Sequence, residues 1–133
     1  MTIQFSTAVR NAMLDNIEST IGTSAKLQIY SGSAPANCGT AASGTKLVEY
    51  ALASDWWAAA GSGAKALNNL PLSSTGLANG TAGYFRIVDS AGTTCHMQGT
   101  VGTSGTDMTI DNTSINTGQT VNVTGWTLTA PGA

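Results

Sequence analysis

The stretch GYFRIVDSAGTTCHMQGTV, residues 83–101, decides the fold class, because its pattern is that of a β-hairpin. Apolar and polar residues alternate on both sides of Ser90–Gly92, which is the period of a half-buried strand. A three-residue loop with Gly92 in the left-handed bulge position pairs Asp89 with Thr93. This register predicts an apolar face on which Phe85 lies opposite Met97 and Ile87 lies opposite Cys95. The outer face then carries Tyr84, Arg86, His96 and Gln98.

Short segments of strand character lie on both sides of this hairpin, separated by clusters of Gly, Ser, Asn and Thr. In the last segment the apolar parity switches at Gly125, which predicts a β-bulge. We expect loops at residues 31–45 and 73–81, and strands at residues 26–30, 46–52, 65–70, 107–111 and 120–129. Such a series predicts a mainly β protein, an antiparallel β-sandwich of jelly-roll-like form over about residues 26–130.

The N-terminal segment has a helical period instead, with Ser6 or Thr7 as N-cap and Gly22 as C-terminal stop. One α-helix is therefore predicted over about residues 6–21, and we expect it to pack on the sandwich within a single domain, residues 1–133. Its apolar arc comprises Val9, Met13, Leu14, Ile17 and Ile21. Arg10 projects into this arc. Either its aliphatic stem lies along the edge of the core while its guanidinium reaches water, or it is an anchor at a contact between subunits.

Charged residues make up only 9% of the 133 residues, and the net charge is −2. A surface of Thr, Ser, Asn, Gly and Ala costs less free energy to desolvate than a surface of ions, which suits a protein built into an assembly or one that works in a crowded exterior. An ordinary β-rich domain with polar, uncharged loops is the alternative. The five Lys and Arg residues are scattered, whereas nucleic-acid binding needs a basic patch, so we expect no nucleic-acid partner. No apolar run is long enough to span a membrane and no secretory signal is evident, so we expect no membrane partner and synthesis in a cytoplasm.

No arrangement of residues in the sequence indicates an enzyme, a cofactor or a metal site. The single histidine, His96, has no neighbouring nucleophile and acid that would form a triad. Asp107 and Asp111 flank a short strand whose alternation points both carboxylates to solvent. Cys38 and Cys95 are expected as free thiols after cytoplasmic synthesis, with a disulfide formed after release as the alternative.

The adjacent Trp56 and Trp57 are the strongest candidates for a contact surface. Neighbours in an extended segment point to opposite sides, so at most one of them is expected to enter the core. The other would cover a loop, meet a protein partner or stack on a sugar ring. The candidate protein-contact residues are Arg10, Trp56, Trp57, Tyr84 and Arg86.

Four stretches together resemble a family of small virion proteins of tailed phages and prophages: residues 4–22, 29–38, 80–96 and 107–115. The resemblance covers nearly the whole chain and implies a capsid decoration (cement) protein that is synthesised in the cytoplasm of a bacterial host. It implies a jelly-roll-like subunit on the virion surface, partnered by the major capsid protein and by copies of itself, with no catalytic residues. A tail, collar or fibre-associated component is the alternative, and a carbohydrate-binding module is a further one.

Overall fold

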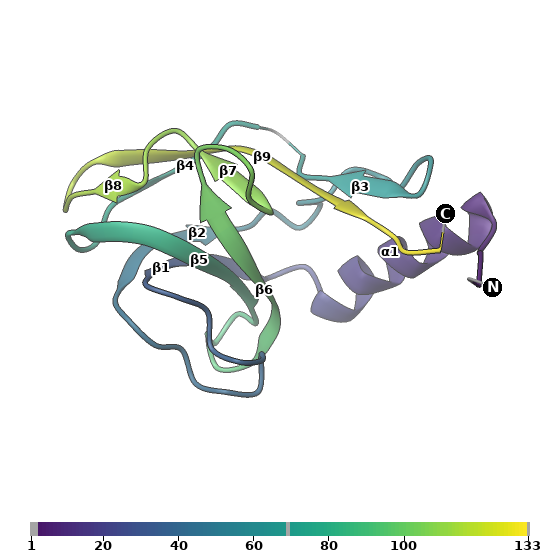
Figure 1. The fold of residues 1–133 in the computed structure, drawn as a ribbon, viewed down its shortest axis with the longest axis horizontal. Coiled ribbons are helices and arrows are strands. Elements are labelled where there is room, and N and C mark those ends of the chain that lie inside the picture. Colours follow the sequence, from purple (N-terminus) through teal and green to yellow (C-terminus); the bar gives the residue numbers. More distant parts are fainter. Residues whose placement is uncertain (1–2, 69, 133) are drawn as a thin grey trace.

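The computed structural model describes residues 3–68 and 70–132 and shows one helix, α1 (Thr7–Ile21), with nine strands (Figure 1). The strands are β1 (Lys26–Ser31), β2 (Lys46–Ala51), β3 (Ala64–Ala66), β4 (Leu72–Thr75), β5 (Gly80–Val88), β6 (Cys95–Gly102), β7 (Met108–Ile110), β8 (Ser114–Ile115) and β9 (Thr120–Thr129). The predicted class, mainly β with one N-terminal helix, is confirmed. The expected loop at residues 73–81 is wrong in part, because β4 and the start of β5 lie there.

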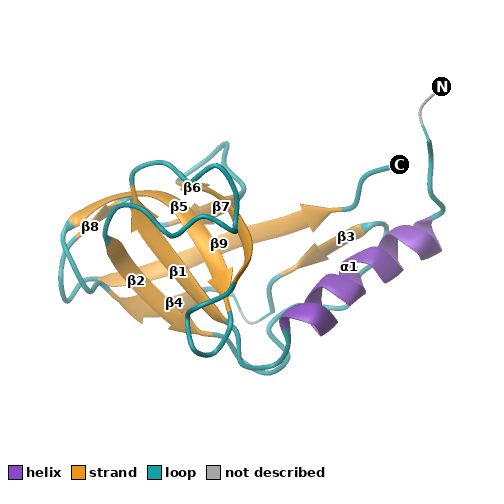
Figure 2. Cartoon of the chain, turned by 90° about the horizontal axis from the view of Figure 1, so that it is seen from below, coloured by secondary structure: helices purple, strands orange, loops and turns teal. Residues whose placement is uncertain are grey.

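The strands form one curled sheet in the order β2-β1-β5-β6-β7-β9-β3, with β4 also paired to β9 and β8 to β5 (Figure 2). The sheet is not wholly antiparallel, as the prediction had it, because β7 runs parallel to β6. Residues 103–107 form the loop between these two strands and bring the chain back, so that β7 runs beside β6 in the same direction. The Asp107 carboxylate holds this loop by accepting hydrogen bonds from the backbone N–H and the hydroxyl of Thr100, at 2.9 and 3.0 Å.

The core lies inside the curl and is centred on aromatic side chains. Trp56 and Trp57 stack with ring centroids 4.7 Å apart, and Trp57 lies 4.9 Å from Trp126. Phe85 meets Trp126 edge-on at 5.3 Å, which is a favourable geometry for two aromatic rings. Aliphatic residues from β1, β2, β5, β7 and β9 surround these rings: Leu27, Ile29, Leu47, Val48, Ile87, Ile110, Val121 and Val123.

The β5–β6 hairpin exists and Gly92 has a positive φ of 74°, as predicted, but the predicted register is wrong. Phe85 faces Gly99 and Ile87 faces Met97, and a bulge follows before Val88 faces Cys95. The bulge turns Cys95 onto the face of Val88, away from the apolar face to which the sequence assigned it. The longer loop is stabilised by Asp89, whose carboxylate accepts the backbone N–H of Thr93 at 2.8 Å and of Thr94 at 3.2 Å.

Helix α1 begins and ends where the sequence predicts, with Ser6 accepting a hydrogen bond from the Val9 N–H and Gly22 closing the last turn. The helix packs on one end of the curled sheet and not across its body. It lies beside β3 and the far end of β9, which project together from the body of the molecule (Figures 1 and 2). Its buried residues are therefore Arg10, Leu14 and Ile21, whereas Val9 of the predicted apolar arc is exposed.

The C-terminal part of the sheet contains the bulge that the sequence predicts. The pairing of β7 with β9 shifts register between Thr109, which faces Gly125, and Ile110, which faces Val123. The irregularity thus falls beside Gly125, as the parity switch predicts. Asp107 and Asp111 are both exposed, also as expected. The predicted strand over residues 65–70 is shorter, because β3 ends at Ala66, and residue 69 lies outside the described residues.

Candidate functional site

The candidate site is built around a loop, residues 32–45, that joins β1 to β2 and folds over the outer face of β1 and β5. A disulfide between Cys38 and Cys95 ties this loop to β6, with the two Cα atoms 5.2 Å apart. The expectation of two free thiols is therefore wrong. The β6 bulge turns Cys95 onto the outer face, where the loop brings Cys38 within bonding distance. We call residues 32–45 the disulfide loop.

The polar side chains of the outer face hold the disulfide loop in place. Arg86 is buried and its Nη2 donates to the carbonyl oxygen of Thr40 at 2.7 Å. The Tyr84 hydroxyl donates to the carbonyl oxygen of Ser43 at 2.6 Å and accepts from the Ser43 N–H at 3.0 Å. Gln98 Nε2 donates to the Pro35 carbonyl oxygen at 2.8 Å. Three of the four residues predicted to face outward, Tyr84, Arg86 and Gln98, thus contact the chain's own loop.

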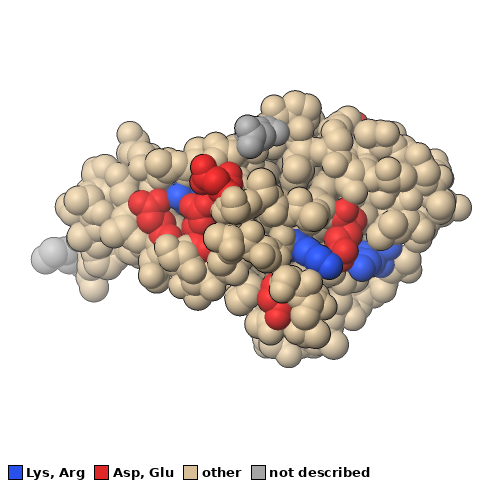
Figure 3. Space-filling view, turned by 180° about the vertical axis from the view of Figure 1, so that it is seen from behind, with Lys and Arg blue, Asp and Glu red and all other residues tan. Residues whose placement is uncertain are grey.

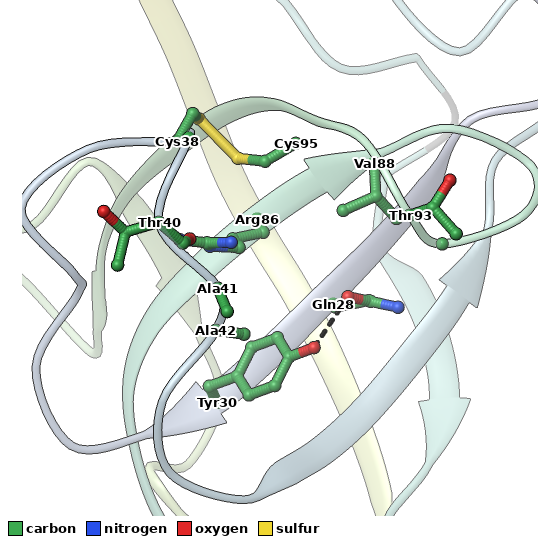
Figure 4. A pocket seen from close by; sticks show the side chains of 12 residues that line it. Gln28, Tyr30, Cys38, Thr40, Ala41, Ala42, Arg86, Val88, Thr93 and Cys95 are labelled. Carbon is green, nitrogen blue, oxygen red and sulfur yellow. Dashed lines mark hydrogen bonds between the residues drawn. A yellow bond between two sulfur atoms is a disulfide. The ribbon is translucent and has the colours of Figure 1, made fainter.

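A pocket of about 370 Å³ lies between the disulfide loop and the sheet (Figure 4). Figure 4 shows Tyr30 and Gln28 on its floor, joined by a hydrogen bond of 2.9 Å from the Tyr30 hydroxyl to Gln28 Oε1. Burial raises the pKa of Tyr30, with nearby Lys46 opposing the rise, so this hydroxyl stays neutral, donates to Gln28 and can accept a hydrogen bond from a bound group. The remaining walls are Thr40, Ala41, Ala42, Thr93 and the disulfide. Such a lining can hydrogen-bond a small polar group, and it presents no carboxylate or imidazole for acid–base chemistry.

A second hollow, of about 470 Å³, lies beside α1 and β3 and contains an ion cluster in which only the lysine is buried. The Lys65 side chain is 1% exposed, and its Nζ lies 2.7 Å from Asp15 Oδ1 and 2.8 Å from Glu18 Oε2. Burial alone would lower the pKa of Lys65, but the hydrogen bonds to Asp15 and Glu18 outweigh it and raise the pKa. Lys65 therefore stays charged and fixes α1 against β3, which is a structural role.

All five cationic side chains are engaged within the described chain. Arg10 donates from Nε and Nη2 to the Ala130 carbonyl oxygen, at 3.2 and 2.9 Å. Lys26 and Lys46 both lie beside Glu49, at 3.7 and 3.0 Å. Arg86 and Lys65 are buried, as described above. Figure 3 shows the result on one face, where charged side chains occur in small mixed groups on a surface that is otherwise uncharged.

The five candidate contact residues are all buried inside the chain: Arg10, Trp56, Trp57, Tyr84 and Arg86. The expectation that at most one tryptophan enters the core is wrong, because Trp56 and Trp57 are 2% and 1% exposed. They lie outside the regular strands, so the strict alternation of a strand does not apply to them. The head of Arg10 does not reach water either, because the end of β9 covers it.

Comparison with protein-family models, curated proteins and solved structures finds no match to this chain. In residues 3–68 and 70–132, no helix has the length and apolar character needed to cross a membrane. The same residues contain no group of three His, Cys, Asp or Glu side chains arranged to hold a metal ion.

The sequence predicts a loop at residues 31–45 but gives no sign that this loop folds over the outer face of the sheet. Its composition, rich in Ala, Gly and Ser, gives no periodic signal. The two cysteines could have been joined on paper only with the correct hairpin register, since the predicted one turns Cys95 away from the loop.

Proposed function

We propose that this chain is a structural protein of a tailed-phage virion, most specifically a capsid decoration protein. In this role it would bind the lattice of the major capsid protein, together with copies of itself, on the virion surface. The observation that carries the proposal is a surface with few charges, on which every Lys and Arg side chain has a partner within the described chain. Arg10, Lys65 and Arg86 are buried, and the half-exposed Lys26 and Lys46 share Glu49.

A surface of this kind favours association with protein. Ser, Thr and Gly groups lose hydration at much smaller cost than ions do, so broad neutral contacts form without a large desolvation penalty. A decoration protein is present in many copies, and weak contacts at each copy sum by multivalency. The absence of a basic patch in the described residues also argues against a phosphate backbone as the partner.

The stability of the outer face fits a part exposed outside the cell. The disulfide loop is held by one covalent bond and by hydrogen bonds from Tyr84, Arg86 and Gln98. Disulfides persist in oxidising surroundings, such as a released virion. As part of the same proposal, we classify the curled sheet as an irregular relative of the jelly-roll-like sandwich of cement proteins.

Of the two alternative functions, the structure weakens the second and leaves the first as a competitor. A tail or collar component would use the same neutral surface and stays the competing proposal. The carbohydrate-binding module loses its main support, because both Trp56 and Trp57 lie in the core and offer no ring to a sugar.

The test is sedimentation of the purified protein with expanded, undecorated capsids of the phage or prophage that encodes it. We expect stoichiometric co-sedimentation and added density at regular lattice positions in images of the pellet. Because neutral contacts are weakly screened, retention should be similar at about 0.1 M and about 1 M salt. Fully decorated capsids are the control and should bind no more protein. If the protein stays in the supernatant at saturation, the capsid proposal fails and purified tails become the next partner to test.

A further inference from the structure

The sheet contains a gap beside β7. This strand has only three residues, Met108–Ile110, and separates β6 from β9 only along that length. Beyond it, in the described chain, residues 95–99 of β6 pair with β5 alone and residues 127–129 of β9 pair with β3 alone. Figure 1 shows β6 and β9 diverging from β7 with no strand between them.

Backbone groups on both sides of the gap point into it. The Thr100 N–H donates to Asp107 and therefore points away from β5, and by alternation the Gln98 backbone points the same way. On β9, the Trp126 carbonyl oxygen and the Ala130 N–H bond toward β3. The backbone groups of Thr127 and Thr129 consequently point into the gap. Unpaired strand edges of this kind are templates for an added strand.

The gap in the sheet lies directly over the aromatic core. A hollow of about 200 Å³ lies between β6 and β9, with Phe85 and Trp126 at its base. Met97 and Leu128, both half-buried, form its apolar sides, and Gln98, Gly99, Asp107 and Thr127 complete the lining. The hollow is therefore a window in the sheet that suits one aliphatic side chain carried on an extended backbone.

The chain also carries a segment of matching character. Residues 3–6 read Ile-Gln-Phe-Ser, which alternates apolar and polar residues as a strand does and has no charged side chain. Ile3 is 75% exposed and Phe5 42%. The Phe5 N–H bonds to the Gly132 carbonyl oxygen at 2.7 Å, and from there the segment extends away from the start of α1 (Figure 2). In its own molecule it leads away from the gap.

We propose that the N-terminal segment of one copy adds as a strand into the gap of a second copy, with Ile3 in the window over Phe85 and Trp126. The segment carries no charge, so it brings no ion into the apolar part of the window, and the Asp107 carboxylate beside the window already accepts two hydrogen bonds from Thr100. Strand addition gives affinity through main-chain hydrogen bonds and specificity through the side chain that enters the pocket. Donor and acceptor are different surfaces, so the contact is heterologous and builds rings or chains.

The first experiment compares two variants of the full chain, Ile3→Glu and Gln4→Glu, by sedimentation velocity over a wide concentration series. Both variants add the same charge at adjacent exposed positions, but alternation points only residue 3 into the window. We expect the wild type and Gln4→Glu to associate with increasing concentration. Ile3→Glu should associate at least about tenfold more weakly, because its carboxylate would enter an apolar site.

The second experiment tests the acceptor directly with a synthetic peptide of residues 1–8 added to the Ile3→Glu protein. We expect saturable binding and a change in tryptophan fluorescence, because Trp126 lies at the base of the window. A peptide that carries Ile3→Glu should not bind. The inference is overturned if the wild type stays monomeric throughout the series, or if both peptides bind equally. Capsid binding by the monomeric variant is a separate measurement, so failure here leaves the virion proposal untouched.

Discussion

At the scale of single residues, Trp56 and Trp57 show how adjacent side chains with the same chemistry can have different energetic roles. Both are buried, and their rings stack on each other and against Trp126. Trp56 Nε1 donates to the Gly22 carbonyl oxygen at 3.2 Å, which links the core to the end of α1. Trp57 Nε1 is buried without a partner in the described residues. An unsatisfied buried donor costs stability, whereas a satisfied one contributes to it.

This contrast predicts unequal effects of the same substitution. Trp56→Phe removes packing and a hydrogen bond, whereas Trp57→Phe removes packing and relieves an unpaired N–H. We expect Trp56→Phe to lower the free energy of unfolding by about 1 kcal/mol more than Trp57→Phe. Urea denaturation of both variants, followed by far-UV circular dichroism, measures the difference. A larger loss for Trp57→Phe would contradict this account.

At the scale of elements, α1 is held on the projecting end of the sheet by polar contacts. Arg10 passes beside Gly63 to reach the Ala130 carbonyl oxygen, and Asn11 accepts the Gly63 N–H at 2.8 Å. Lys65 adds its ion pairs to Asp15 and Glu18. These contacts need Gly63, which has a positive φ of 73° and lies against the Arg10 guanidinium.

Two glycine substitutions test this attachment. Gly63→Ala places a Cβ in the space of the Arg10 guanidinium and in a strained backbone conformation, so we expect a loss of more than about 2 kcal/mol in stability. Gly61→Ala is the matched control, because its Cβ would meet nothing within 4 Å. Thermal unfolding should therefore show a clear decrease in Tm for Gly63→Ala and little change for Gly61→Ala. Equal Tm values would mean that Arg10 does not hold α1.

The disulfide loop is the second element whose attachment can be measured. Cys38 and Cys95 are separated by 57 residues, and closing a loop of that size removes about 4 kcal/mol of unfolded-state entropy on the chain-entropy account. We expect reduction, or the double substitution Cys38→Ala and Cys95→Ala, to lower the free energy of unfolding by about 2–4 kcal/mol. Guanidinium unfolding with and without reductant gives the value, and free-thiol titration verifies the redox state. An unchanged denaturation midpoint in reductant would exclude a stabilising bridge.

At the scale of the whole molecule, a small number of charges is balanced almost entirely by internal contacts. The hydrogen bond from Lys65 lowers the pKa of Asp15 below its ordinary value of 3.8. Burial raises the pKa of Glu49, but hydrogen bonds from Gln28 and Lys46 outweigh this and lower it below 4.5. A lowered carboxyl pKa means that the unfolded chain binds protons first, so stability is present above the ordinary pKa and lost below it.

Acid should therefore destabilise the protein in a defined range. We expect the free energy of unfolding to fall as the pH drops from about 6 to about 3, as Asp15 and Glu49 lose their charge and Lys65 loses its partner. Lys65→Met removes the cause of the Asp15 shift and should make this fall shallower. Lys26→Met is the control, because Lys26 is half-exposed and its ion pair contributes little. Denaturation midpoints at a series of pH values decide the matter, and parallel curves for wild type and Lys65→Met would refute the prediction.

The sequence by itself determined the features that depend on neighbouring residues. Ser6 and Gly22 mark the ends of α1, because capping uses backbone groups within one turn of the helix. Gly92 marks the hairpin loop because this position has a positive φ, which glycine adopts easily, and Gly125 lies beside the β9 bulge, where a Cβ would come within 3.0 Å of the Thr109 hydroxyl. The mainly β class follows from the same local alternation.

Only the tertiary structure decided which distant groups meet. The hairpin register depends on the Asp89 loop and a bulge, and it turned Cys95 toward Cys38 across 57 residues. Trp57 is buried because Trp126, far along the chain, supplies a ring against which it packs. Arg10 is buried because the end of β9 offers it a carbonyl oxygen. These outcomes depend on contacts between segments far apart in the chain, and periodicity within one segment carries no information about the partner that another segment brings.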